Sequence, residues 1–157
     1  MIEQQPPTSG KAALVTGATS GIGRAAAISL ARRGYRIIVV GRDADRGVEV
    51  VEELDRVGAG GEFLSFDLLD LGDIRRLARE VTERYRHLDM LLNSAGGTFR
   101  AKALTPDGIE RTFAFNTIAP YAITTALLSP PQSERGAGGE RHHPGTSPHA
   151  PQCRRAD

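Results

Sequence analysis

The sequence predicts an open α/β fold built on a doubly wound parallel sheet. Across the first 128 residues, short apolar runs alternate with longer segments whose apolar residues recur at helical spacing. The first apolar run ends in a glycine-rich turn that leads directly into a helical segment. Strands and helices that alternate in this way form right-handed crossovers and a parallel sheet covered on both faces. A ligand site is then expected beyond the carboxyl ends of the strands, where the strand order reverses.

The first strand–helix–strand unit is predicted from residues 12–40. Residues 12–15 form a short continuous apolar run, which is typical of a strand buried on both faces. From Gly21 the apolar residues are dense and mostly good helix formers, and Gly34 supplies a stop signal for this helix. Residues 36–40 are mainly apolar and β-branched, and they predict the second strand.

Two further units continue the alternation. Apolar residues at helical spacing between Val48 and Val57 predict a second helix, which ends at a glycine-rich turn. Residues 62–66 predict the third strand, Asp73 is expected to start a charged amphipathic helix, and residues 89–92 predict the fourth strand. The expected sheet is incomplete, with about four strands in the order 3-2-1-4.

The last predicted element is a long helix over residues 106–128. Thr105 is a favourable N-cap residue, and Pro106 suits the first position of a helix because its missing N–H costs nothing there. Apolar residues then recur as far as Leu128. We expect one continuous helix.

The chain divides into three parts. Residues 1–10 are expected to be disordered, and residues 11–128 form a single nucleotide-binding domain. Residues 129–157 contain no Val, Ile, Leu, Met, Phe, Tyr or Trp, but five Pro and four Gly. Such a segment cannot contribute to a core and is expected to be a disordered tail. Two interpretations stay open: a linker, or a translation of GC-rich DNA in a shifted reading frame.

Composition excludes several functional classes. The formal net charge is +1, so no nucleic-acid or anionic-lipid partner is expected. A lone Cys153 excludes an internal disulfide framework and a thiolate metal cluster, and we expect no metal site from the histidines of the tail. No signal peptide or membrane-spanning run is recognisable, so we expect a cytoplasmic protein with no membrane partner.

The turn from Thr16 to Gly23 has the chemistry of a phosphate-binding loop. Its glycines permit a tight turn and allow backbone N–H groups to approach a pyrophosphate closely. The N-terminus of the following helix favours negative charge through the helix dipole. Because the turn lies between a buried strand and a helix, it predicts the binding of a dinucleotide.

The string Thr-Gly-Ala-Thr-Ser-Gly-Ile-Gly at residues 16–23 resembles the short-chain dehydrogenase/reductase family. Asp67 and Leu68 follow the third strand and resemble the family's Asp-hydrophobe pair beside the adenine. Residues 93–96, Asn-Ser-Ala-Gly, resemble the family's Asn-Asn-Ala-Gly with one substitution; the family uses this motif to stabilise the sheet and line the cofactor ribose. The resemblance covers residues 11–128 and implies a Rossmann-type fold.

Two further matches concern the long helix. Residues 104–110 resemble the start of the family's interface helix, particularly in members that act on lipophilic alcohols, and Asn116 falls where the family has its helix-kinking catalytic Asn. The resemblance therefore implies an oxidoreductase that transfers a hydride between a small-molecule alcohol and a carbonyl, and a homo-oligomer formed through the helix at 106–128. The expected cofactor-binding residues are Gly17, Thr19, Ser20, Gly21, Ile22, Gly23, Arg42, Asp67, Leu68, Asn93, Ala95 and Gly96.

The end of the second strand indicates which cofactor is preferred. A carboxylate there would accept hydrogen bonds from the ribose 2′-OH of NAD, whereas an arginine pairs with the 2′-phosphate of NADP. The sequence places Gly41 at the acidic position and Arg42 beside it, which favours NADP over NAD. Asp43 takes the acidic role if the strand ends later, and Arg24 is a weaker second candidate for phosphate binding.

Most of the family's catalytic group is not recognisable. The resembled family uses a Tyr, a Lys four residues later and an upstream Ser, whereas this chain has only Lys11 and Lys102 and no Tyr precedes a Lys at that spacing. Asn116 is the one recognisable member. We therefore expect a C-terminally truncated or frameshifted family member with little or no dehydrogenase activity. The alternatives are a catalytically dead NADP-binding or interaction module and a gene remnant without function.

Overall fold

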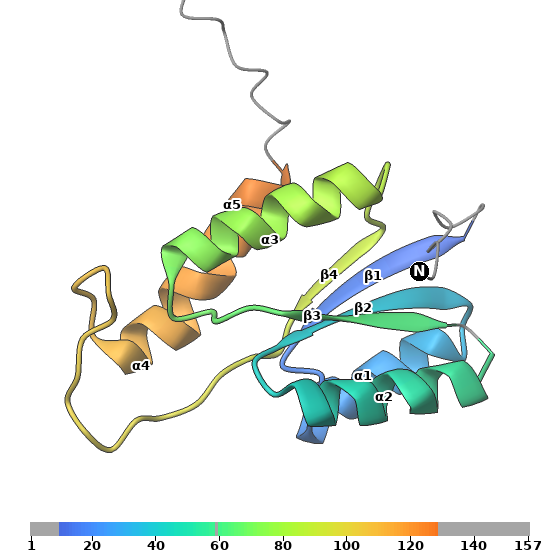
Figure 1. The fold of residues 1–157 in the computed structure, drawn as a ribbon, viewed down its shortest axis with the longest axis horizontal. Coiled ribbons are helices and arrows are strands. Elements are labelled where there is room, and N and C mark those ends of the chain that lie inside the picture. Colours follow the sequence, from blue (N-terminus) through green and yellow to red (C-terminus); the bar gives the residue numbers. More distant parts are fainter. Residues whose placement is uncertain (1–9, 59, 129–157) are drawn as a thin grey trace, which may run out of the picture.

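The computed structural model describes residues 10–58 and 60–128 (Figure 1). It contains a parallel sheet of the strands β1 (Lys11–Thr16), β2 (Tyr35–Gly41), β3 (Gly61–Ser65) and β4 (Met90–Asn93). The strands lie in the order β3-β2-β1-β4, and every neighbouring pair is parallel. The predicted fold class and strand order are confirmed.

The carboxyl ends of the strands meet at one edge of the sheet. Thr16, the last residue of β1, lies opposite Val40 on one side and opposite Asn93 on the other. From β1 the chain builds outward to β2 and β3, and then returns to place β4 on the free side of β1. The strand order therefore reverses beside Thr16, which is where ligands bind in open α/β sheets.

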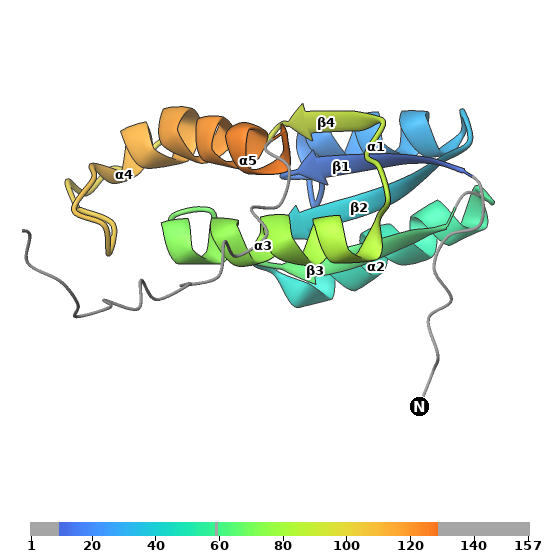
Figure 2. The same cartoon turned by 90° about the horizontal axis from the view of Figure 1, so that it is seen from above.

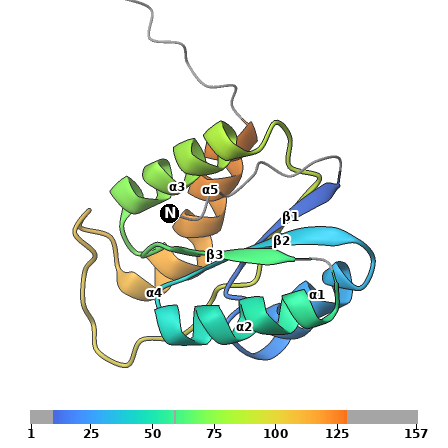
Figure 3. The same ribbon diagram turned by 45° about the vertical axis from the view of Figure 1, so that its right-hand side comes forward.

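Helices cover both faces of the sheet (Figures 2 and 3). The helices α1 (Gly21–Ala31) and α2 (Ala44–Arg56) lie on one face. The helices α3 (Leu71–Arg84) and α5 (Ala119–Leu128) lie on the other. Strands covered in this way are apolar throughout rather than alternately polar, which is why residues 12–15 are a continuous apolar run.

Each face of the sheet has its own apolar cluster. Leu14 and Ile38 pack with residues of α3 and α5, including Ile123. Val15, whose side chain points to the opposite face, packs in a second cluster with residues of α1 and α2, including Leu54. All of these side chains are fully buried or nearly so. The two clusters hold the glycine-rich turn between rigid elements, since that turn joins β1 to α1.

The third helix begins earlier than predicted. The N-cap is Asp70, whose carboxylate accepts hydrogen bonds from the backbone N–H groups of Gly72 and Asp73 at 2.6 and 3.3 Å. Asp73 lies within the first turn, where a negative charge also favours the helix. The sequence offers an aspartate at both positions, and the prediction that Asp73 starts the helix was wrong.

The predicted start of the long helix, at Thr105 and Pro106, was also wrong. The Thr105 C=O accepts from the Gly108 N–H at 2.9 Å, and the Thr105 N–H donates to the Ile109 C=O at 2.8 Å. These bonds close a tight turn, and Gly108 has a φ of 76° in the left-handed region. Proline is favoured early in a turn because its φ is fixed, and the same property suits the first position of a helix. Glycine is favoured at the end of such a turn.

The helical segment begins instead at Arg111. It consists of α4 (Arg111–Phe113), a π-helical turn η1 (Ala114–Ile118) and α5. Glu110 is the N-cap, and its carboxylate accepts from the N–H groups of Thr112 and Phe113 at 2.9 and 2.8 Å. These hydrogen bonds to the ionised form lower the pKa of the Glu110 carboxyl.

Among the described residues, none of the helices has both the length and the apolar character needed to cross a bilayer. In the same part of the chain, no group of three or more His, Cys, Asp or Glu side chains is arranged to hold a metal ion. Cys153, the histidines of the tail and the predictions made for residues 1–9 and 129–157 lie outside the described residues.

Candidate functional site

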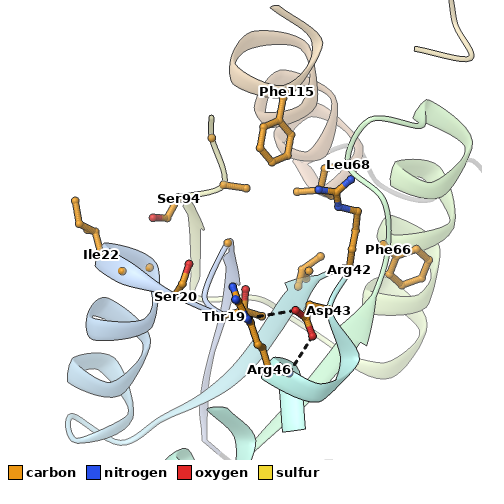
Figure 4. Close-up of a pocket in the computed structure, with 17 residues that line it drawn as sticks. Thr19, Ser20, Ile22, Arg42, Asp43, Arg46, Phe66, Leu68, Ser94 and Phe115 are labelled. Atoms are coloured by element: carbon orange, nitrogen blue, oxygen red, sulfur yellow. Dashed lines mark hydrogen bonds and ion pairs between the residues drawn. The ribbon is translucent and has the colours of Figure 1, made fainter. Parts of the chain in front are cut away.

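A cleft of about 910 Å³ opens at the carboxyl ends of the strands, beside the point where their order reverses (Figure 4). This volume is in the range of cofactor and small-molecule sites. Ten of the twelve predicted cofactor-binding residues line the cleft, and Asp67 and Asn93 do not. The lining residues are Gly17, Thr19, Ser20, Gly21, Ile22, Gly23, Val40, Gly41, Arg42, Asp43, Arg46, Phe66, Leu68, Ser94, Ala95, Gly96 and Phe115.

Two glycines of the turn allow backbone to approach backbone. Gly17 has a φ of 68°, and a Cβ atom there would lie 2.7 Å from the Cα and N atoms of Ala95. A Cβ at Gly23 would lie 2.4 Å from the Gly17 carbonyl oxygen. Both distances are too short for any other residue. The glycines therefore let β1, the start of α1 and the segment after β4 meet at one point.

The N-terminus of α1 faces this cleft without an internal cap. Ser20 occupies the N-cap position, but its side chain makes no capping hydrogen bond to the first turn. The first turn also contains no acidic residue. Its backbone N–H groups and the positive end of the helix dipole are thus free to bind an anionic group, as at other phosphate-binding helix N-termini.

The end of β2 brings charged side chains to the cleft. Arg42 and Asp43 follow the last residue of β2, and Arg46 is in the first turn of α2. The Asp43 carboxylate is the N-cap of α2 and accepts from the Arg46 N–H at 3.1 Å. Arg24, the weaker phosphate candidate, lies outside the lining set and forms an ion pair with Glu53 at 2.8 Å.

Asp67 lies at the side of the cleft rather than in its lining. Its Oδ1 accepts from the Leu69 N–H at 3.0 Å and lies 3.8 Å from Nη1 of Arg42. The Asp67 N–H donates to the Asp73 carboxylate, and this hydrogen bond, together with Arg76, lowers the pKa of Asp73. The segment after β3 is therefore fixed to the start of α3, and Leu68 lines the cleft.

A buried hydroxyl holds the segment after β4. The Thr16 side chain is 1% exposed, and its Oγ1 accepts from the N–H groups of Ser94 and Ala95 at 3.1 and 3.2 Å. This tether places Ser94, Ala95 and Gly96 along the cleft. We did not predict a separate role for Thr16, because its partners are almost eighty residues away along the chain.

Asn93 points away from the cleft, toward the helix α5. Its Nδ2 donates to Thr124 Oγ1 at 3.2 Å, and its Oδ1 is buried with no hydrogen-bond partner among the described residues. The hydrogen bond from Asn93 to Thr124 thus joins β4 to the helix α5. Asn93 is not among the residues that line the cleft.

Asn116 lies in the π-helical turn η1 and connects it to the segment after β4. Its Oδ1 accepts from the Gly97 N–H at 3.0 Å, and its Nδ2 donates to the Gly97 C=O at 2.7 Å. Nδ2 also donates to the C=O of Thr112, four residues earlier, which the Asn116 N–H would bond in a regular α-helix. The side chain thus stabilises the local distortion of the helix, and π-turns of this kind often occur at functional sites.

Sequence reasoning missed several residues that line the cleft. Arg46, Phe66, Ser94 and Phe115 were not predicted as site residues. Ser94 lies inside a motif that we had quoted, and Arg46 follows an N-cap residue by three positions, so both carried a usable signal. Phe66 and Phe115 gave none, because their approach depends on how two distant segments pack.

Comparison with known proteins gives a family match over most of the chain. Residues 11–139 match the family profile described as short chain dehydrogenase. This range includes every site residue predicted from the sequence and the first residues after Leu128.

Two curated relatives and one solved structure illustrate the match. Polyprenol dehydrogenase of Mus musculus is 40% identical over 137 residues, which are 85% of this chain and 40% of that protein. Retinol dehydrogenase 11 of Mus musculus is 35% identical over 121 residues, 76% of this chain and 38% of that protein. A metagenomic short-chain oxidoreductase crystallised in complex with NADP superimposes with a TM-score of 0.68 at 31% identity, over 76% of this chain and 55% of that one. The chain thus spans less than half the length of these curated relatives.

Proposed function

Because the chain belongs to the short chain dehydrogenase family, we propose that its cleft binds NADP(H) for hydride transfer between an alcohol and a carbonyl. One observation carries this proposal. The uncapped N-terminus of α1 and the Arg42 side chain open onto the same cleft. The first suits a pyrophosphate and the second suits a 2′-phosphate.

The residues present fit the cofactor. Gly17 and Gly23 let the turn, the start of α1 and the segment after β4 pack closely around the uncapped N-terminus of α1, because a Cβ atom at either position would clash with backbone. With Gly41 at the end of β2, there is no carboxylate at the position that selects the ribose 2′-OH of NAD. The NADP complex of the similar metagenomic oxidoreductase supports the same choice.

We assign the remaining subsites from the places of the side chains. Asp67 and Leu68 flank the adenine, Leu68 by apolar contact and Asp67 from the side of the cleft. Ala95 and Gly96 line the ribose part, held there by the hydroxyl of Thr16. Asn93 stabilises the sheet without contacting the cofactor.

For catalysis, a bound cofactor would supply the hydride, and the chain must supply a proton donor for the developing alkoxide. Asn116 fixes the loop beside the cleft through Gly97. No Tyr of the 157 residues is followed by Lys four positions later. We therefore propose that this chain binds the cofactor and turns over little or no substrate by itself.

A second candidate is a binding or interaction module without catalysis. The exposure of the helical segment from Arg111 to Leu128 favours it, because Phe113, Tyr121 and Leu128 are 52%, 70% and 78% accessible. We propose that this segment pairs with a second copy or an intact homologue. The expected homo-oligomer and the expected cytoplasmic location remain parts of the proposal.

The proposed substrate is a lipophilic alcohol or the corresponding carbonyl compound. Relatives named for polyprenol and retinol support this class. The cleft itself has apolar side chains from Ile22, Leu68 and Phe115 beside its polar groups.

Calorimetric titration of the purified chain with NADP, NADPH and NAD tests the proposal. We expect saturable binding with NADP tighter than NAD, and we expect Arg42→Ala to remove most of that preference. An unchanged preference in Arg42→Ala would show that Arg42 has no part in it. Sustained NADPH oxidation with a panel of carbonyl compounds, abolished by Asn116→Ala, would contradict the proposed lack of turnover.

A further inference from the structure

Three charged side chains surround the start of α2 at one end of the cleft. The lining of the cleft includes Arg42, Asp43 and Arg46. Of the two arginines, only Arg42 was predicted as a phosphate-binding residue, because it directly follows the end of β2. In Figure 4 dashed lines join the Arg46 side chain and backbone, at the start of α2, to Asp43, whereas the Arg42 side chain extends toward Leu68. The two guanidinium groups therefore border the cleft from different elements.

Both oxygens of the Asp43 carboxylate are directed at Arg46. Oδ1 accepts from the Arg46 backbone N–H at 3.1 Å, and Oδ2 lies 3.3 Å from Arg46 Nε. A carboxylate at this place would otherwise repel a phosphate and accept from a ribose hydroxyl. Arg46 compensates its charge, and its side chain remains 62% exposed to solvent on the side of the cleft.

Arg42 has a weaker competing contact. Its Nη1 lies 3.8 Å from Asp67 Oδ1, and both side chains are largely exposed. Ion pairs of this kind contribute little because water and salt screen them. Arg42 can therefore turn from Asp67 to a phosphate at small cost.

We propose that Arg46 is a second specificity-determining cation for the 2′-phosphate of the adenosine ribose, and that Asp43 positions it. This inference rests on the proposed binding of NADP in the same cleft. Arginine presents N–H groups in a planar fork that matches phosphate oxygens, so a phosphomonoester held by Arg42 and Arg46 receives charge-assisted hydrogen bonds from two sides. Both carboxylate oxygens of Asp43 face Arg46, so this acid is directed at Arg46 rather than at a ribose hydroxyl.

The test uses two small probes that differ only at the 2′ position. Adenosine 2′,5′-bisphosphate carries the extra phosphate and adenosine 5′-monophosphate does not. We expect Arg46→Ala to weaken binding of the bisphosphate on the order of tenfold, the value of one charge-assisted hydrogen bond, and to leave the monophosphate within about twofold. Arg46→Lys keeps the charge but loses the planar fork of N–H groups. Its affinity for the bisphosphate should therefore lie between those of the wild type and Arg46→Ala.

Two further variants separate positioning from general destabilisation. Arg84→Ala is the control, because it removes an arginine that is paired with Glu80 and Glu62 and does not line the cleft. It should leave both affinities unchanged. Asn is as good an N-cap as Asp, so Asp43→Asn in the Arg46→Ala background keeps the cap, removes the unpaired charge and should recover part of the lost bisphosphate affinity.

The outcomes are distinct. Selective loss of bisphosphate binding in Arg46→Ala, with recovery in the double variant, supports the inference. Equal loss of both probes, or no loss, overturns it while the proposed function stands. If the wild-type chain binds neither probe, the proposed function itself is wrong.

Discussion

The side-chain amide of Asn116 forms hydrogen bonds with both backbone polar groups of Gly97. Oδ1 accepts from the Gly97 N–H at 3.0 Å and Nδ2 donates to its C=O at 2.7 Å. The two residues belong to different parts of the fold: Asn116 lies in the π-helical turn η1, and Gly97 lies in the loop after β4. This pair determines how the loop beside the cleft sits on the helix layer.

Asn116→Ala removes the three hydrogen bonds of this amide, two of them to Gly97. We expect faster hydrogen exchange at the Gly97 amide and a loss of about 1 kcal/mol in the free energy of unfolding, because the bonds are exposed to water. Exchange by NMR and urea unfolding measure the two effects. Thr82→Ala, which removes a hydroxyl bonded only within α3, should leave Gly97 exchange unchanged. Equal protection of Gly97 in Asn116→Ala would contradict the proposed tether.

Gly17→Ala should be far more damaging than Gly34→Ala, although both glycines have positive φ values of 68° and 85°. At Gly34 no atom lies within 4 Å of an added Cβ, so only the backbone strain of about 1 kcal/mol applies. At Gly17 the Cβ would also meet Ala95 at 2.7 Å, which adds about 1–3 kcal/mol of overpacking. Denaturant unfolding compares the two variants. Similar losses would mean that the contact with Ala95 is not tight.

The fold was largely predictable because its signals are local. A buried strand such as residues 12–15 is recognisable from its own composition, and the order of strands follows from the Rossmann-type doubly wound fold that the family resemblance implied. The start of the long helix was not predictable in this way. Thr105 and Pro106 are equally good as a helix start and as a turn, and the turn is chosen because Gly108 and Ile109 complete its hydrogen bonds.

The site was predictable where a residue acts through its position in a motif, as with the glycines from Gly17 to Gly23. It was not predictable where a role depends on contacts between distant segments. The bonds from Ser94 and Ala95 to Thr16 exist only once the elements have assembled. Composition and spacing carry no record of such contacts.

Thr16→Val keeps the shape of the buried side chain but removes the oxygen that accepts from Ser94 and Ala95. Two backbone N–H groups then lose their partner, and we expect a loss of about 2 kcal/mol in the free energy of unfolding and weaker cofactor binding. Thr16→Ser retains the hydroxyl and should keep most of the affinity, although it leaves a small cavity. Thermal unfolding and NADP titration measure both effects. If the Val and Ser variants bind NADP equally well, the hydroxyl does not hold the ribose-lining segment.

The phenol of Tyr85 predicts how the stability of the chain changes at high pH. Burial and the hydrogen bond to the Glu62 carboxylate together raise the pKa of Tyr85 to about 12, against a smaller opposing effect of nearby Arg36. Since the ordinary value is 10.0, the folded state favours the protonated phenol, so its contribution is intact below pH 10 and is lost as the pH rises toward 12. Tyr85→Phe should flatten the fall in stability across that window, while Tyr121→Phe, on an exposed side chain, should not. Urea unfolding between pH 9 and pH 12, with tyrosinate absorbance as a second readout, tests this; the same alkaline slope in Tyr85→Phe and wild type would show that ionisation of another group sets the alkaline limit.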